Sequence, residues 1–123
     1  MDEEGHTLEE IMVLVREFVQ ARDWEGFQKP SSLAVSAAIE IGELLERFQW
    51  LTHEEIAELL KREEYRLSIE EEIADVMIYM IRLADTIGLE PTKVILRKLQ
   101  KNESKYPVKD WKGRIPDKVR HSR

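Results

Sequence analysis

Residues 38–46 read AIEIGELLE, and residues 70–77 read EEEIADVM. Each stretch places two carboxylates three residues apart within a largely apolar helical segment. Because a helix turns by about 100° per residue, Glu40 and Glu43 share one helix face, and so do Glu72 and Asp75. Carboxylates at the edge of a core are costly to bury unless a cation pairs with them. Neither segment has a Lys or Arg spaced to pair with both of its acids. Four acids that converge from two helices therefore predict a site for a hard cation.

The ligand chemistry of these acids narrows the choice of metal. Ligands that are all oxygen atoms select Mg²⁺, Mn²⁺ or Ca²⁺ over softer metals. A ferritin-like site would need a Glu-x-x-His motif on two helices, and the sequence contains none. A single Glu-x-x-Glu pair is usually a solvated acidic helix face. Here two such pairs occur, each beside an apolar stripe. The sequence therefore allows two interpretations, a metal site or a solvated acidic face.

The composition is that of one compact helical domain. The chain has 123 residues, of which 42% are hydrophobic and 36% are charged, with few Gly and Pro. The absence of Cys excludes disulfides and thiolate zinc sites. No run approaches the roughly 20 apolar residues that span a bilayer, and the acidic N-terminus is unlike a signal peptide. We therefore expect a cytoplasmic protein with no membrane partner.

The net charge of −6 is unevenly distributed along the chain. Residues 108–123 contain six Lys or Arg and two Asp, a net charge of +4, which leaves −10 on residues 1–107. We expect residues 1–107 to form the functional domain and residues 108–123 to form a basic, extended or loose tail. An acidic body disfavours nucleic-acid polymers as partners. A substrate that carries phosphate would need metal ions as intermediaries.

Capping motifs and apolar spacing predict an all-α bundle. Three capping boxes, one further Ser and one Pro mark helix starts, and one Gly marks a helix end. In chain order these signals are Thr7/Glu10, Ser31 or Ser32, Thr52/Glu55, Ser68/Glu71, Gly88 and Pro91. The predicted helices span residues 8–22, 33–50, 53–62, 69–87 and 91–105, and residues 61–67 are predicted to be a solvated connection.

The segment of residues 22–32 contains Gly26, Pro30 and two Ser residues, so it is predicted to be a loop. Trp24 and Phe27 lie in this loop. They are expected either to form a lid or pocket wall or to anchor the loop to the core, and the sequence favours neither.

The fourth predicted helix is apolar on nearly all sides, because Ala74, Ile78 and Ile81 lie opposite a stripe that includes Val76 and Met80. A helix of this kind is buried on two sides. In a chain of four or five helices, the second side is expected to face another subunit.

Several short motifs surround the acid pattern, in which 28 residues separate Glu43 from Glu72. These motifs are Arg22-Asp23-Trp24, Gly42-Glu43-Leu44, Phe48-Gln49-Trp50, Asp75-Val76 followed by Ile78-Tyr79, and Lys98 with Asn102-x-x-x-Tyr106-Pro107. Their order resembles that of the MazG-like all-α nucleoside triphosphate pyrophosphohydrolases, and most of all the dCTP pyrophosphatase branch. The resemblance covers about residues 7–110 in register.

The resemblance implies hydrolysis of a (deoxy)nucleoside triphosphate to the monophosphate and pyrophosphate, with Mg²⁺ or Mn²⁺ as cofactor. The implied substrate is dCTP or a modified pyrimidine, the implied role is sanitising the nucleotide pool, and the implied assembly is a homodimer or homotetramer. By position, the implied metal ligands are Glu40, Glu43, Glu72 and Asp75. Contacts to base and sugar are implied for Trp24, Trp50 and Tyr79. Contacts to phosphates, from the same or a neighbouring subunit, are implied for Lys98, Lys101, Asn102 and Tyr106.

Phosphoryl transfer needs positioning and charge neutralisation more than covalent chemistry. A carboxylate only partly engaged with metal could accept the proton of the attacking water, and the candidates are Glu40 and Glu43. Simpler interpretations of the other residues remain open. Trp50 could be only a core cap, and Lys98 and Lys101 could be a solvated helix face. Tyr79 lies one turn beyond Asp75 on the same face, which favours a place in the site.

Two positions depart from the pattern of the animal dCTP-specific enzymes. Val15 stands where a His is expected, and Gln28-Lys29 replaces His-Gln before Pro30. Both departures leave the base preference open, so dUTP, a modified nucleotide or a phosphoribosyl-ATP type of substrate is an alternative. An alternative of another class is a non-catalytic acidic helical interaction module, which would need no metal and would tolerate Glu43→Gln.

Overall fold

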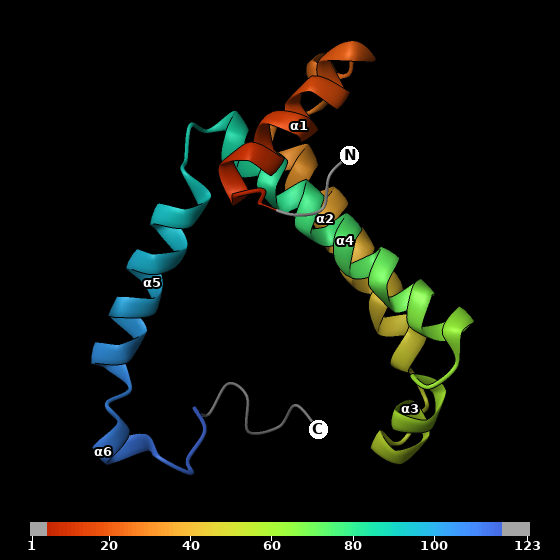
Figure 1. The fold of residues 1–123 in the computed structure, drawn as a ribbon, viewed down its shortest axis with the longest axis vertical. Helices are drawn as coiled ribbons and strands as arrows, with labels where there is room; N and C mark the ends of the chain where they lie inside the picture. The colour runs from red at the N-terminus through yellow and green to blue at the C-terminus, as the bar shows by residue number, and fades with distance from the viewer. Residues whose placement is uncertain (1–4, 117–123) are drawn as a thin grey trace. The chain divides into compact units, whose positions relative to one another are not determined.

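The computed structural model describes residues 5–116, and most of them are helical (Figure 1). The elements are α1 (Leu8–Ala21), the 3-10 turn η1 (Glu25–Phe27), α2 (Pro30–Phe48), α3 (His53–Leu59), α4 (Glu63–Thr86), α5 (Pro91–Lys105) and α6 (Val108–Trp111). No strand occurs in the described range, so the all-α prediction is confirmed. None of the described helices is long and apolar enough to cross a membrane.

The chain forms two compact units, the first ending at Pro91 and the second beginning at Thr92. The first unit therefore contains α1 to α4, and the second contains nearly all of α5 together with α6. The assignment of residues 1–107 to one functional domain stays a prediction.

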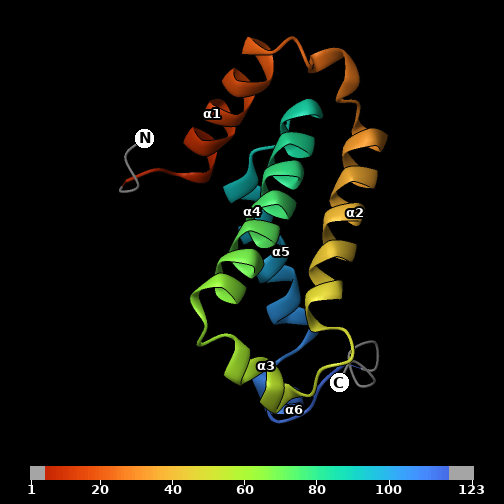
Figure 2. The same cartoon turned by 90° about the vertical axis from the view of Figure 1, so that its right-hand side faces the viewer.

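The first unit is built on α2 and α4, which lie side by side and antiparallel, with the short α3 between them in sequence (Figure 1 and Figure 2). Leu33 and Ala37 on α2 and Ile69 on α4 are buried. Glu40 follows Ala37 by three residues, and Glu72 follows Ile69 by three, so both acids continue the buried stripes. The fold itself therefore carries these two carboxylates into the interface between the helices.

Two further contacts fix the arrangement of the first unit. The Tyr65 hydroxyl of α4 donates a hydrogen bond to the Arg47 carbonyl oxygen of α2, at 2.7 Å. On α1, Met12 and Val19 are buried on one face, two turns apart, and α1 contacts α4. Burying a side chain of this size contributes roughly 1.5–3 kcal/mol.

The capping boxes Thr7/Glu10 and Thr52/Glu55 are confirmed, since in each the side chains and backbone N–H groups bond reciprocally. Gly88 has φ +75°, which suits a residue just beyond the end of α4. The predicted start of the second helix is wrong by three residues, because α2 begins at Pro30 with Lys29 as its N-cap. A proline at the first helical position lacks only an N–H that would have no partner there.

The predicted connection at residues 61–67 is largely wrong, because α4 begins at Glu63 instead of residue 69. Charged residues that suggest a solvated connection are also good helix formers. Arg66 and Glu70 form an ion pair of 3.2 Å one turn apart. Ser68 is not an N-cap, since its hydroxyl donates to the Tyr65 carbonyl oxygen at 2.6 Å within the helix.

The second unit contains one element that the sequence did not predict. Residues 108–111 form the short helix α6 where an extended or loose tail was expected. Trp111 explains the difference, because its ring packs edge-on against Tyr106 with 5.0 Å between ring centroids. Residues 117–123 of the predicted tail lie outside the described residues.

Candidate functional site

Glu40, Glu43 and Glu72 converge where α2 packs against α4. One carboxylate oxygen from each residue lies within 4.8 Å of the other two. Glu72 is buried, with 8% of its surface exposed, Glu40 is half-buried, and Glu43 is exposed. The cluster therefore has an inner edge in the helix interface and an outer edge from which an ion in solvent can enter.

Two oxygens of this cluster lack a partner. Oε2 of Glu40 and Oε2 of Glu72 are buried and accept no hydrogen bond from the described part of the chain. Leaving a buried polar group unsatisfied costs about 1–3 kcal/mol, and more for a charged group, so an arrangement of this kind calls for an explanation. A hard divalent ion supplies one, because carboxylate oxygens are the ligands such ions prefer. The residues present therefore fit a divalent cation.

The crowding of the acids changes the protonation of one of them. Burial raises the pKa of Glu40 to about 7, and the neighbouring carboxyls of Glu43 and Glu72 favour its protonated form further. The negative charges of Glu43 and Asp75 act in the same direction. Without a cation, Glu40 is thus only partly ionised near neutral pH, and a divalent ion would compete with its proton.

One cation reaches the cluster from α2. Nη2 of Arg47 lies 3.5 Å from Oε1 of Glu72, at the limit of a hydrogen bond. The Arg47 side chain is 46% exposed, and an ion pair of this exposure contributes little stability. Residue spacing within one helix does not reveal this contact, which exists because α2 and α4 are neighbours.

Asp75 lies beside the three-carboxylate group and is not a member of it. It is exposed, and with Glu40 it lines a pocket of about 300 Å³. The structure thus brings three of the four predicted ligands together and places the fourth at the adjoining pocket. The pocket is lined by Val15, Phe18, Val19, Trp24, Gln28, Glu40, Asp75, Ile78, Tyr79 and Arg82.

The loop before α2 forms part of this pocket. Trp24 is 44% exposed, and its ring meets that of Phe18 edge-on at 5.7 Å between centroids. A second hollow of about 280 Å³ shares Trp24, Gln28 and Tyr79 with the first. Phe27 lines the second hollow and is 77% exposed. The structure therefore favours the pocket-wall interpretation of Trp24 and Phe27 over that of core anchors.

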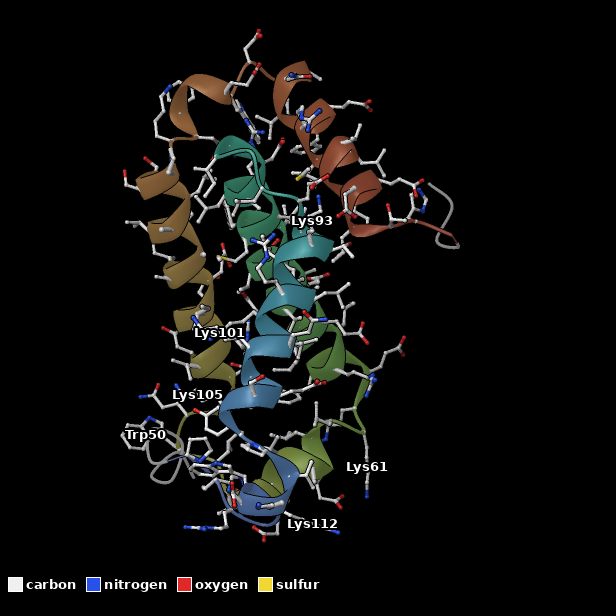
Figure 3. All side chains as sticks on the ribbon, turned by 90° about the vertical axis from the view of Figure 1, so that its left-hand side faces the viewer. Trp50, Lys61, Lys93, Lys101, Lys105 and Lys112 are labelled. Atoms are coloured by element: carbon white, nitrogen blue, oxygen red, sulfur yellow. The ribbon has the colours of Figure 1, made fainter. Side chains whose placement is uncertain are left out.

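Trp50 takes a position that the sequence did not predict. It lies outside α2, which ends at Phe48, and 90% of its surface is exposed. Figure 3 shows its side chain projecting outward beyond the end of the helix. Its φ of +67° falls in the left-handed region, which a bulky side chain rarely adopts. The interpretation of Trp50 as a core cap is therefore wrong.

The predicted phosphate-binding residues belong to the second unit. Lys98 and Lys101 are exposed on α5, and Asn102 and Tyr106 are half-buried. Lys101 and Lys105, four residues apart, project to the same side of α5 (Figure 3). The contact of Lys98, Lys101, Asn102 and Tyr106 with phosphates stays a prediction.

A second charged network, which the sequence did not predict, lies near the C-terminal end of α4. Arg16 of α1 donates from Nε and Nη2 to the two carboxylate oxygens of Asp85, at 2.8 and 2.7 Å. Arg82 donates from Nη1 to Asp85 Oδ2 at 2.9 Å and from Nε to Gln28 Oε1 at 2.8 Å. The hydrogen bond from Arg16 holds the pKa of Asp85 below its usual value. Only the spacing of Arg82 and Asp85 was visible in the sequence.

Comparison with known proteins places this arrangement in a family. The sequence model of the MazG-like family matches residues 35–114, which is more than half of the chain. Among curated proteins, dCTP pyrophosphatase 1 from Homo sapiens is 38% identical and that from Rattus norvegicus is 36% identical, each over 102 residues. Both matches cover 83% of this chain and 60% of the relative, so the chain spans about 60% of the length of the curated relatives that it matches.

This chain is also similar to a solved structure. A pyrophosphatase from Archaeoglobus fulgidus DSM 4304 superposes with a TM-score of 0.76 at 42% sequence identity. The superposition covers 87% of this chain and 98% of that chain. The chain belongs to the MazG-like family.

Proposed function

We propose that this chain is a nucleoside triphosphate pyrophosphohydrolase. It converts a (deoxy)nucleoside triphosphate to the monophosphate and pyrophosphate, with Mg²⁺ as cofactor and with dCTP or a modified pyrimidine as the first candidate substrate. The observation that carries the proposal is the pair of buried, unpartnered oxygens, Oε2 of Glu40 and Oε2 of Glu72, beside Glu43. The relatives named dCTP pyrophosphatase and pyrophosphatase support it.

In this proposal Glu40, Glu43 and Glu72 hold the metal, together with Asp75 at the pocket side. When bound, Mg²⁺ supplies charge neutralisation for phosphate oxygens and a water of lowered pKa. Glu40 or Glu43 accepts the proton of the attacking water.

The residues around the pocket provide the contacts to the nucleotide. Trp24 and Tyr79 flank the base, because both line the hollows next to Glu40 and Asp75. Lys98, Lys101, Asn102 and Tyr106, from the same or a neighbouring subunit, hold the outer phosphates. Trp50 is 90% exposed in a single chain, so its contact with the base requires closure of the site or a second subunit.

Assembly into a homodimer or homotetramer is part of the proposal. The large apolar side chains that stay exposed on α4 support it, because contiguous exposed apolar surface often marks an interface. These residues are Leu67, Ile73, Met77, Ile78 and Met80, with exposed fractions of 43–52%. Light scattering at micromolar concentration should give twice or four times the mass of 14.5 kDa, and a monomer mass would reject the assembly.

The test of the activity is pyrophosphate release from a panel of nucleotides, including dCTP, 5-methyl-dCTP, dUTP and dGTP, with Mg²⁺ and then with EDTA. We expect release that needs the metal, and we expect hydrolysis in ¹⁸O-labelled water to label the monophosphate. Such an enzyme would remove unwanted nucleotides from the cytoplasmic pool. If no nucleotide is hydrolysed and no metal is bound, the chain is an acidic helical interaction module instead.

A further inference from the structure

We propose that Gln28, positioned by Arg82, reads the nucleobase by donating a hydrogen bond from its amide NH₂ group. The inference rests on the proposed function and deepens it, because it names the class of base that the pocket accepts. That class presents adjacent hydrogen-bond acceptors, as cytosine does at N3 and O2.

The orientation of the Gln28 amide follows from its partner. A guanidinium group has donors and no acceptor, and Nε of Arg82 lies 2.8 Å from Oε1 of Gln28. The amide oxygen must therefore face Arg82, and the NH₂ group must point away from it. Gln28 lines both hollows beside Trp24 and Tyr79. The part of Gln28 left for a ligand is thus a donor.

Arg82 is itself held in place, so it can fix the rotamer of a loop residue. Its side chain is 9% exposed, and its Nη1 donates to Asp85 Oδ2 at 2.9 Å. Asp85 in turn accepts two hydrogen bonds from Arg16. This chain of contacts joins α1, α4 and the loop before α2. Supporting hydrogen bonds of this kind fix the position and orientation of a functional side chain, as recognition of a ligand requires.

The chemistry of this part of the pocket selects among bases. Gln28 and Arg82 both offer N–H groups, whereas Glu40 and Asp75, which also line the pocket, are the candidate metal ligands. Donors fit cytosine, whose N3 and O2 are adjacent acceptors, and they also fit O6 and N7 of guanine. Uracil and thymine keep the O2 acceptor but present N3–H in place of the N3 acceptor, so the donor opposite N3 would face another donor and lose its partner.

The decisive variant is Gln28→Glu. A Glu side chain has the same length and still accepts the hydrogen bond from Arg82, but it has no donor when ionised. We expect kcat/KM for dCTP to fall by about tenfold or more, mainly through KM, because one unpaired buried group changes binding by about that factor. The ratio of kcat/KM for dCTP to that for dUTP should fall by a similar factor. Gln20→Glu on the exposed face of α1 is the matched control, with the same change of charge and no expected change in the ratio.

Arg82→Lys tests the positioning role. Lysine keeps the charge opposite Asp85 but cannot bond Gln28 and Asp85 with a fixed planar group. We expect the same loss of base preference with kcat nearly unchanged, and we expect the side-chain NH₂ resonances of Gln28 to broaden in ¹⁵N NMR spectra. If Arg82→Lys does not fold, Gln28→Glu alone decides.

Nucleotide binding with Ca²⁺ in place of Mg²⁺, followed by tryptophan fluorescence, separates this inference from the proposed function. A protein that binds dCTP without hydrolysing it contradicts the activity, while the ratio of dCTP to dUTP affinity still tests the role of Gln28. If the wild type prefers dUTP, or if Gln28→Glu changes the ratio by less than twofold, the inference is overturned. If no nucleotide binds, both proposals are overturned.

Discussion

Two regions of one helix, the middle and the C-terminal end of α4, treat their carboxylates in opposite ways. Near its C-terminal end, α4 holds Asp85 between the guanidinium groups of Arg16 and Arg82, and both carboxylate oxygens accept hydrogen bonds. The charge of Asp85 is therefore balanced, whereas Glu72, in the middle of the helix, lies among other carboxylates with one oxygen unpaired. A network whose partners are all protein groups stabilises a fold. A network with missing partners, such as the one around Glu72, fits a divalent cation.

The pKa values follow the same division. Hydrogen bonding to Arg16 lowers the pKa of Asp85, whereas burial raises that of Glu40 to about 7. Burial alone raises the pKa of any carboxyl group, so the two sites differ because only one of them contains enough cations. The comparison therefore predicts that the Asp85 network matters most for stability and the acidic cluster most for function.

The largest expected effect is on turnover in Glu43→Gln. Loss of a metal ligand usually removes several kcal/mol of transition-state stabilisation, so turnover should fall by about a thousandfold or more. Without metal, the variant should melt at or above the temperature of the parent, because one source of repulsion is gone. Rates and metal-free melting curves check both statements. A variant that melts well below the metal-free parent would make Glu43 a structural residue.

Arg82→Ala is expected to have the largest effect on stability. It leaves Asp85 with one partner fewer in a site where both side chains are at most 10% exposed. Removing one partner of a buried ion pair typically costs about 3–5 kcal/mol, to be measured as a free energy of unfolding in urea. Lys61→Ala, which removes an exposed pair with Glu58, is the control and should cost far less. If the two variants lost equal amounts of stability, the Asp85 network would not have the stabilising role that we assign to it.

The pH dependence of stability should have opposite signs at the two sites. Because the folded protein binds a proton at Glu40 more tightly than the unfolded chain does, metal-free protein should lose stability as the pH rises from about 4.5 to about 7. The contribution of Asp85 is present above its ordinary pKa of 3.8 and is lost as the pH falls through its lower folded value. Unfolding in EDTA at a series of pH values measures both effects. Glu40→Gln should abolish the decline between 4.5 and 7, and a variant with the slope of the parent would refute the assignment.

The smallest effect is expected for Arg47→Ala. Arg47 is 46% exposed and lies 3.5 Å from Glu72, so its loss should change stability by less than about 1 kcal/mol. It should also raise the affinity for Mg²⁺, since the ion no longer competes with a guanidinium for Glu72. Calorimetric titration with Mg²⁺ measures this affinity. A marked loss of stability would show that the acidic cluster is closed by the protein itself.

The helices and the acid pairs could be predicted from the sequence because both are local patterns. A capping box such as Thr7/Glu10 spans four residues, and Glu40 and Glu43 share a face whatever they pack against. The contacts of Arg47 with Glu72 and of Arg16 with Asp85 join different helices, so they depend on how those helices are aligned. The spacing of residues within one helix does not determine how two helices are aligned.

At two other places the structure differs from the prediction for a local reason that amino-acid composition does not show. Residues 63–67 are charged and polar enough for a loop, yet they continue α4 because Glu and Arg also favour helix. Trp50 has a positive φ, which a sequence suggests for Gly or Asn and not for a bulky aromatic residue. Its exposed position could therefore not be predicted from its residue type.

We propose above all that the unpartnered oxygens of Glu40 and Glu72 are ligands for a divalent cation. Electron paramagnetic resonance of Mn²⁺ tests it directly, since free and protein-bound Mn²⁺ are distinguished without any turnover. We expect wild-type protein to bind Mn²⁺, Glu72→Gln to lose that binding, and Asp85→Asn, if folded, to retain it. The account would be contradicted if wild-type protein bound no Mn²⁺ at millimolar concentration, or if Glu72→Gln bound it as tightly as the wild type.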